Sequence, residues 1–388
     1  MHFVCGKVAE YYFHPMNSDI IQLESYRADY PVLKEYTYLN TPATGIVHPK
    51  VQQAAQEASE KMTIHGSKYR EEWMFETKAE VKEAVAKFIN APVEGIVLAQ
   101  NFTIPMNMLA EMLYSEGKKV AYIQGDYPSL VMPFRVRGFE MHEYKLDGDG
   151  RIDYNALEDF LRQNRIDILA ISHVQWGTGY VVSLTEVAQM CKLQGVFSVV
   201  DATQGAGVIP VDVKALDVDV LAASTYKWAG AGFGNGFMYV AQKVLEQYEP
   251  KTAGFNSFLW KDGQPYYEAN IKCFEPGHHD HEAFIRLQTA LERQMEMGQE
   301  AILEEVHKLV NYTREQLQLK GLGSIYTFEG REAGSILFVE GDQSTLNALE
   351  EKKVLAAARG KGIRIGLHYY NNFEDVDRFV EIYSELKR

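Results

Sequence analysis

The feature that most constrains the fold is a regular alternation of short apolar runs and amphipathic stretches from about residue 95 onward. GIVLAQ (95–100) and VFSVVD (196–201) are continuous apolar runs rich in β-branched residues, which indicates strands buried on both faces. Strands separated by helices predict a mostly parallel sheet covered on both sides, whose ligands bind beyond the carboxyl ends of the strands. Further strands are predicted over 118–124, 138–144, 166–172, 217–224 and 236–241, and helices over 103–116, 128–137, 153–163 and 183–194.

The pattern changes near residue 281, where one or two long helices begin and run to Gly321. Short predicted strands follow over 323–328, 334–339, 352–357 and 363–367. A last amphipathic helix has one apolar face, made of Val376, Phe379, Val380, Tyr383 and Leu386.

This change of pattern predicts two domains of an α/β protein. The large domain, with its mostly parallel sheet between helices, is expected over 31–285. A smaller α+β domain is expected to combine residues 286–388 with an N-terminal arm of residues 1–30.

Composition narrows the class of protein. The 388 residues are 46% hydrophobic and 24% charged, which is typical of soluble globular proteins. A net charge of −14 disfavours nucleic acids and anionic membranes as partners. No apolar run is long enough to span a membrane, and the N-terminus lacks the apolar core of a secretory signal. We therefore expect neither a membrane nor a nucleic acid as a partner.

The cysteine and histidine patterns suggest neither a disulfide framework nor a metal site. Cys5, Cys191 and Cys273 lie far apart without a CxxC motif, which suits the reducing cytosol and predicts a cytoplasmic protein. HHDH (278–281) has no second cluster of ligands to complete a metal site, so no metal is expected.

A lysine that follows a predicted buried strand is the first candidate catalytic residue. Lys227 ends STYK directly after the apolar run 217–224 and precedes GAGFGNG (230–236), which fits no nucleotide-binding loop. A desolvated lysine amine attacks a carbonyl to form a Schiff base. If that carbonyl belongs to pyridoxal phosphate (PLP), the site also needs a carboxylate for the ring nitrogen, a phosphate cradle and an aromatic face.

Candidates for each of these parts follow successive predicted strands. Asp201 supplies a carboxylate, Thr103 begins a helix, Ser224 and Tyr226 add hydroxyls, and Tyr127 supplies a ring. Each residue taken alone is better explained as a helix cap or a core residue. Their common position at strand exits predicts a single PLP site.

These motifs make the sequence resemble the class V aminotransferase family. This branch of the fold-type I PLP-dependent transferases includes cysteine desulfurases, kynureninases and isopenicillin N epimerase-like enzymes. The strongest segment spans 198–236, from SVVDATQ to STYKWAGAGFGNG, and the likeness extends from YLNTPATG (38–45) to IRIGLHYYNNFEDVD (363–377). The resemblance implies the fold-type I architecture, PLP as cofactor, and a homodimer to which 230–236 and 252–258 contribute.

The resemblance also implies roles for individual residues. Lys227 would form the internal aldimine and move protons, Asp201 would pair with the pyridinium, and Arg364 would bind the substrate α-carboxylate through two parallel N–H bonds. The implied cofactor contacts are Phe102, Thr103, Tyr127, Gln175, Asp201, Gln204, Ser224, Tyr226 and Lys227.

The activity implied first is that of a class V aminotransferase acting on a small amino acid through an external aldimine. A PLP-dependent lyase, a kynureninase-like hydrolase and an epimerase remain alternatives, and Tyr226, where many members have histidine, favours the last two. A non-catalytic binding protein is disfavoured because Lys227, Asp201 and Arg364 are all present. Persulfide transfer of the usual desulfurase kind is not expected, because no cysteine follows Cys273 to accept the sulfur.

Overall fold

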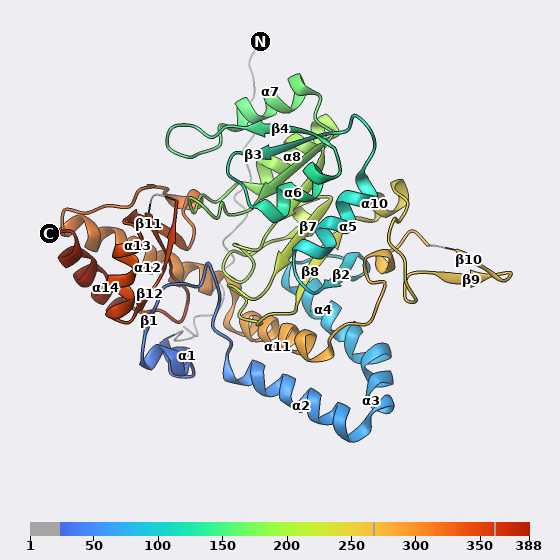
Figure 1. Ribbon diagram of the computed structural model, residues 1–388, viewed down its shortest axis with the longest axis horizontal. Helices are drawn as coiled ribbons and strands as arrows, with labels where there is room; N and C mark the ends of the chain where they lie inside the picture. The colour runs from blue at the N-terminus through green and yellow to red at the C-terminus, as the bar shows by residue number, and fades with distance from the viewer. Residues whose placement is uncertain (1–23, 267, 361) are drawn as a thin grey trace, which may run out of the picture.

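The computed structural model describes residues 24–266, 268–360 and 362–388 (Figure 1). Most of the predicted N-terminal arm, residues 1–23 with Cys5, lies outside the described residues. In the part of the chain that is described, no helix is long and apolar enough to cross a membrane.

The molecule has a large part and a small, C-terminal part (Figure 1). A seven-stranded sheet forms the centre of the large part, in the order β2-β8-β7-β6-β5-β3-β4. Only β8 runs antiparallel to its neighbours, and every other pairing in this sheet is parallel. The predicted mostly parallel sheet is therefore confirmed, and six strands point their carboxyl ends to one edge. The strands are β2 (Ile96–Ala99), β3 (Lys119–Ile123), β4 (Glu140–Tyr144), β5 (Ile168–Ser172), β6 (Phe197–Asp201), β7 (Val220–Ser224) and β8 (Gly236–Val240).

Helices between these strands cover the sheet (Figure 1). Their starts carry the expected signals: Asp153, for example, caps α7 by accepting a hydrogen bond from Ala156 N at 3.0 Å. Strands β2, β5 and β7 are buried along their whole length, which explains their continuous apolar sequence. The crossover helices are α5 (Thr103–Leu113), α6 (Pro128–Val136), α7 (Tyr154–Asn164), α8 (Leu184–Gln194) and α9 (Val213–Leu216).

A second group of helices packs on the large part from the N-terminal and central segments. Helix α11 (His281–Met297) packs against α2 (Pro49–His65) and α4 (Lys78–Phe88), as Figure 1 shows. The long helical stretch predicted after 281 breaks at Gly298, whose φ of 82° begins α12 (Gln299–Leu319). The other elements of the large part are α3 (Ser67–Glu72), η2 (Trp73–Thr77), η3 (Val93–Gly95), α10 (Gln242–Gln247) and η4 (Ile271–Phe274). Helix α1 (Glu24–Arg27) and η1 (Pro31–Lys34) instead lie beside the C-terminal part, where Arg27 pairs with Asp375.

The C-terminal part contains two small sheets. Strands β11 (Ile336–Glu340), β14 (Gly362–Gly366) and β13 (Ala357–Arg359) form an antiparallel sheet, while β1 (Thr37–Tyr38) pairs in parallel with β12 (Val354–Leu355). The other elements of this part are α13 (Gln343–Glu351), α14 (Phe373–Leu386) and η5 (Gly330–Glu332).

One expectation for the C-terminal part was wrong. Residues 323–328 form no strand, because Ser324 makes only an isolated bridge to Val339 and the apolar alternation there reflects packing of the Tyr326 and Phe328 rings. The predicted last helix is confirmed as α14, whose apolar residues Val376, Phe379, Val380 and Tyr383 are buried, while Leu386 in its last turn is 42% exposed.

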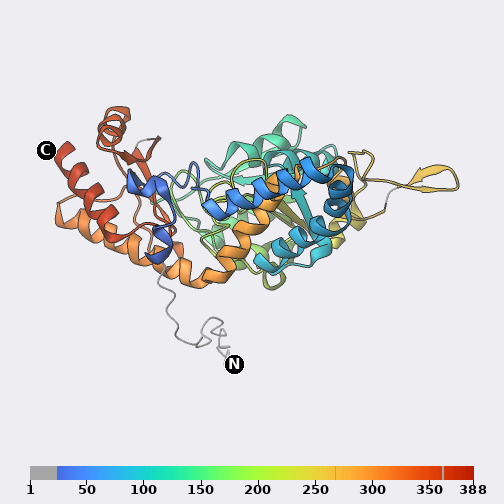
Figure 2. The same cartoon turned by 90° about the horizontal axis from the view of Figure 1, so that it is seen from below.

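The apolar core is divided into clusters that follow this architecture. One cluster fills the large sheet and its helices, and a second joins Leu39 and Trp228 to Ile365 and Phe379 of the C-terminal part. Trp228, the residue after Lys227, thus belongs to the core of the small, C-terminal part. The predicted domain boundaries, 31–285 and 286–388, stay a prediction. A hairpin of β9 (Leu259–Lys261) and β10 (Gln264–Tyr266) projects from the body, as Figure 2 shows.

Candidate active site

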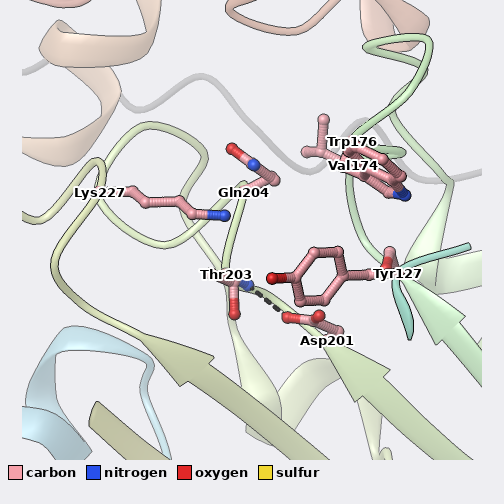
Figure 3. A pocket seen from close by; sticks show the side chains of 8 residues that line it. Tyr127, Val174, Trp176, Asp201, Thr203, Gln204 and Lys227 are labelled. Atoms are coloured by element: carbon pink, nitrogen blue, oxygen red, sulfur yellow. Dashed lines mark hydrogen bonds between the residues drawn. The ribbon is translucent and has the colours of Figure 1, made fainter. Parts of the chain in front are cut away.

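The carboxyl ends of the parallel strands bring the predicted residues to one buried pocket. Figure 3 shows the Lys227 amine and the Tyr127 hydroxyl pointing into the same space above Asp201. This space lies at the edge of the sheet where ligands of open α/β folds bind. The lining residues are Tyr127, Ser172, Val174, Trp176, Asp201, Thr203, Gln204 and Lys227.

Lys227 is 6% exposed and lies three residues past the end of β7. Its Nζ lies 5.5 Å from the ring centre of Tyr127 and 5.6 Å from that of Tyr226. Burial lowers the pKa of the amine to about 8, although the negative charge of Asp201 raises it. The backbone here is tightly packed: a Cβ on Gly45 would lie 1.7 Å from the Lys227 carbonyl oxygen, so only glycine fits at position 45.

Asp201 is the last residue of β6 and is 4% exposed. Burial raises the pKa of its carboxyl to about 6, although a hydrogen bond from Thr203 N at 2.8 Å and the charge of Lys227 both lower it. A buried carboxylate with so little compensation is suited to hold a positively charged nitrogen. Gln204, in the same loop, donates to Pro42 O at 3.0 Å and accepts from Trp228 Nε1 at 2.8 Å.

The predicted phosphate-binding residues come together where β2 and β7 end on either side of β8. Ser224 Oγ accepts a hydrogen bond from Phe102 N at 2.9 Å, and Thr103 is the first residue of α5. The close approach depends on Gly236, because a Cβ there would lie 2.6 Å from Ala223 O. The hydroxyls of Ser224 and Thr103 therefore stand near the start of an α-helix, where anions bind.

The aromatic wall of the pocket is made by two rings. Tyr127 and Trp176 meet edge to face with centroids 5.8 Å apart, and Trp176 Nε1 donates to Gly125 O at 3.0 Å. Gln175 is placed differently from its neighbour: its amide donates to Asp126 Oδ2 at 3.3 Å, and its side chain is not part of the pocket lining.

Sequence reasoning missed several residues of the site. Asp126 is buried and accepts hydrogen bonds from Ser172 and from Tyr127 N, which fixes the loop that carries the Tyr127 ring. Thr203 Oγ1 accepts from Ser224 N at 3.1 Å and so links two strand exits. Asp126 and Thr203 stand within two residues of predicted ones, and their position just after a strand was the available signal.

Tyr226 and Arg364 approach the pocket from opposite parts of the molecule. The Tyr226 ring stacks on Phe233 of the glycine-rich loop at 4.7 Å. Arg364 lies on β14, is 3% exposed and donates to Trp176 O at 3.3 Å, while its buried Nε has no hydrogen-bond partner among the described residues. Burial lowers the pKa of this guanidinium to about 10. An unpartnered buried guanidinium nitrogen is suited to a carboxylate ligand.

The two cysteines that the structure describes, Cys191 and Cys273, are both buried. Burial raises the pKa of Cys191 to about 12 and that of Cys273 to about 11, so both are protonated thiols. Strands β12 and β13 are separated by Ala356 alone, which leaves no loop between them.

The groups present fit PLP. A buried amine, a buried carboxylate, an aromatic face and hydroxyls beside a helix start are the groups that this cofactor requires, and all lie at one sheet edge. The fold and site together define a Schiff-base enzyme site on an open α/β sheet. The chain matches the family "Aminotransferase class-V" over residues 37–379 and belongs to this family of PLP-dependent enzymes.

The relatives that are similar in sequence include an aminotransferase and a cysteine desulfurase. The chain is 25% identical to an "Uncharacterized aminotransferase YcbU" of Bacillus subtilis, over 92% of this chain and 96% of that protein. It is 24% identical to a "Probable cysteine desulfurase" of Pyrococcus abyssi, over 94% of this chain and 97% of the relative.

Solved structures share the fold. A cysteine desulfurase from Thermococcus onnurineus in its apo form superimposes with a TM-score of 0.85 at 23% identity, covering 94% of this chain and 97% of that one. The cystine C–S lyase C-DES, in complex with its product cysteine persulfide, gives a TM-score of 0.84 at 19% identity, covering 92% and 99%. A variant of C-DES has glycine covalently linked to its PLP cofactor.

Proposed function

We propose that this chain is a PLP-dependent enzyme that removes the α-proton of an amino acid. The observation that carries the proposal is the convergence of the Lys227 amine, the Asp201 carboxylate and the Tyr127 ring on one buried pocket. The cofactor, when bound, supplies an electron sink for the bond that breaks at the substrate α-carbon.

The proposed roles follow from the charges of the residues. The pKa of about 8 leaves a fraction of the Lys227 amine neutral near neutral pH, so it can act as a nucleophile and later accept the α-proton. The pKa of about 6 leaves most of Asp201 ionised at the same pH, so it can hold a protonated ring nitrogen. Ser224 and Thr103 would bind the phosphate group.

Arg364 would orient the substrate through its carboxylate. Its guanidinium reaches the pocket from β14 and is close enough to Lys227 to lower the pKa of that amine. A carboxylate fixed by two parallel N–H bonds has a defined orientation, which aligns the α-carbon bond for cleavage.

We propose cleavage of a carbon–sulfur bond as the reaction. Two observations support it: the solved neighbours include a cystine C–S lyase, and neither described cysteine of this chain can accept sulfur as a thiolate. In such an elimination the α-proton leaves, the Cβ–S bond breaks, and its electron pair departs with the sulfur. Hydrolysis of the remaining fragment releases pyruvate and ammonia, so the sulfur leaves as a small product.

Transamination is the second candidate. It is supported by the relative described as an aminotransferase, which matches nearly the whole chain. In this reaction Lys227 would return the proton to the cofactor, and the products would be a keto acid and pyridoxamine phosphate.

The cofactor assignment is tested with Lys227→Ala. The wild-type chain incubated with PLP is expected to gain a visible absorption band and to be trapped by borohydride at Lys227, because a Schiff base forms there. The variant is expected to lose both signals, while Lys214→Ala, an exposed lysine on α9, keeps them. An unchanged band in Lys227→Ala contradicts the proposal.

The reaction is tested by its products. Cystine is expected to yield pyruvate, ammonia and a persulfide, whereas conversion to keto acid with accumulation of pyridoxamine phosphate identifies a transaminase instead. Anthranilate from kynurenine identifies the hydrolase alternative, and racemisation without net conversion identifies an epimerase.

We further propose a cytoplasmic homodimer. Support comes from Phe233 and Phe255, which are 65% and 81% exposed and lie in the segments 230–236 and 252–258. Light scattering is expected to give twice the chain mass of 44.1 kDa, and a monomer at every concentration contradicts the dimer.

A further inference from the structure

The peptide group that joins Trp228 to Ala229, one residue past Lys227, is held by two buried side chains. The carbonyl of Trp228 accepts hydrogen bonds from His368 Nε2 at 2.7 Å and from Gln294 Nε2 at 2.8 Å. His368 lies just past the end of β14, and Gln294 lies on α11. They are 1% and 2% exposed, so both bonds are shielded from water.

These two donors leave other buried atoms unsatisfied. His368 Nδ1 and Gln294 Oε1 have no hydrogen-bond partner among the described residues. A buried polar atom without a partner costs about 1 to 3 kcal/mol. The Trp228 carbonyl itself is fully paired, because two buried side chains donate to it.

The Trp228 side chain is fixed to the same region. Its indole Nε1 donates to Gln204 Oε1, and Gln204 donates in turn to Pro42 O. A Cβ on Gly366 would lie 2.3 Å from Pro42 Cδ and 3.0 Å from Trp228 Cη2, so β14 packs directly on both residues. Trp228, Gln204, Pro42 and β14 therefore form one closed set of contacts.

The same strand carries the group assigned to the substrate. Arg364 lies in β14, four positions before His368, and its Nη1 bonds to Trp176 O at the pocket. One continuous segment of the small part thus holds Arg364 at the pocket and a donor on the carbonyl of Trp228, the residue after Lys227. The contact of His368 with the Trp228 carbonyl and the contact of Arg364 with Trp176 O therefore come from the same segment.

We propose that His368 is a positioning residue that sets the placement of Lys227 relative to Arg364 through its hydrogen bond to the Trp228 carbonyl. This inference rests on the proposed function. Burial lowers the pKa of the imidazole to about 3, so the ring is neutral, and the carbonyl partner requires the proton on Nε2. His368 itself is not among the residues that line the pocket.

Two substitutions separate the donor from the ring. His368→Phe keeps an aromatic ring and removes the donor, and the fold is expected to persist because Gln294 still pairs the carbonyl. His368→Gln removes the ring and keeps an N–H donor at about the reach of Nε2. His307→Phe is the matched control, since His307 on α12 also bonds to a backbone carbonyl, that of Ala333 at 3.1 Å, away from the pocket.

The expected effects are on cofactor chemistry more than on stability. His368→Phe is expected to shift the pH midpoint of the visible PLP band, to slow PLP uptake by the apoprotein, and to lower kcat by about a hundredfold with a smaller change in KM. His368→Gln is expected to recover most of each property, and His307→Phe to match the wild type in all three.

The inference is overturned by a wild-type band, uptake rate and kcat in His368→Phe. It is also overturned when His368→Gln loses as much as His368→Phe or more, because restoring the N–H donor then restores nothing. Absence of any PLP band in the wild type would refute the proposed function and this inference with it. That result is distinct, because it appears before any variant is made.

Discussion

Two buried carboxylates of the large part of the molecule have opposite surroundings. Glu275 is 3% exposed, and its oxygens accept from Lys78 Nζ at 2.6 Å, Lys82 Nζ at 2.9 Å and Leu98 N at 2.8 Å. Asp201 is 4% exposed and accepts from Thr203 N, while Lys227 acts on it only through space.

The pKa values follow these surroundings. Burial alone raises the pKa of both groups, but the charges of Lys82 and Lys78 reverse the effect at Glu275 and leave its pKa below the ordinary value. At Asp201 burial prevails and the pKa rises to about 6. The negative charge of Glu275, beside the edge strand β2, is balanced by two lysines, which stabilises the fold. The negative charge of Asp201, in the pocket, has no such cation at hydrogen-bond distance, and a bound ligand can supply one.

The largest expected effect is on activity at Asp201. Asp201→Asn is nearly isosteric and removes the negative charge that holds the ring nitrogen protonated, so kcat is expected to fall by about a hundredfold to a thousandfold. Steady-state kinetics with PLP in excess measure the loss. If Asp201→Asn retains most of its kcat, the pocket carboxylate has no special role and the comparison fails.

The next effect is on stability at Glu275. Glu275→Gln keeps an oxygen for Leu98 N but leaves Lys78 and Lys82 without their counter-charge, so the free energy of unfolding is expected to fall by about 3 kcal/mol. Urea unfolding measures this change, and the visible PLP band is expected to persist. Glu304→Gln, at an exposed ion pair with Lys308, is the control and should change stability by less than about 0.5 kcal/mol.

The smallest effect is a difference in pH dependence. Because the pKa of Asp201 is raised on folding, the folded apoprotein binds more protons, and its stability falls as pH rises from about 4 to about 6. Asp201→Asn is expected to lack this fall and to gain stability relative to the wild type over that interval. A constant difference between the two proteins would contradict the raised pKa.

Glu275 should show the opposite sign. Its pKa is lowered on folding, so its contribution is present above the unfolded value of 4.5 and is lost as pH falls through the folded value. Comparison of Glu275→Gln with the wild type measures this contribution.

Much of the site could be predicted because its residues follow strands. Asp201 ends a strand, and Lys227, Tyr127 and Thr103 follow within four residues of one, and the apolar pattern of these strands is visible in the sequence. Parallel strands place such positions at one edge, so the local pattern was sufficient to group them. The fold class followed from the same alternation.

The exceptions depended on contacts between distant segments. Gln175 follows β5, and its amide bonds to Asp126, 49 positions away, while its contact with the cofactor stays a prediction. The apolar residues of 323–328 have the alternation of a strand, but their rings pack on neighbouring cores and leave only an isolated bridge. The spacing of apolar residues indicates which side chains are buried, but it does not specify the strand or ring against which they pack.

The sequence by itself determined the α/β class, the sheet edge and the chemical groups that meet there, because strand and helix periodicity are local properties. The tertiary structure decided which charged groups are paired with an opposite charge and which backbone groups are fixed by hydrogen bonds. Glu275 meets Lys78 across 197 positions, and His368 meets Trp228 across 140. Such contacts join residues far apart in the sequence and form only in the folded chain, so the charge state of Asp201 and the placement of Lys227 depend on tertiary structure.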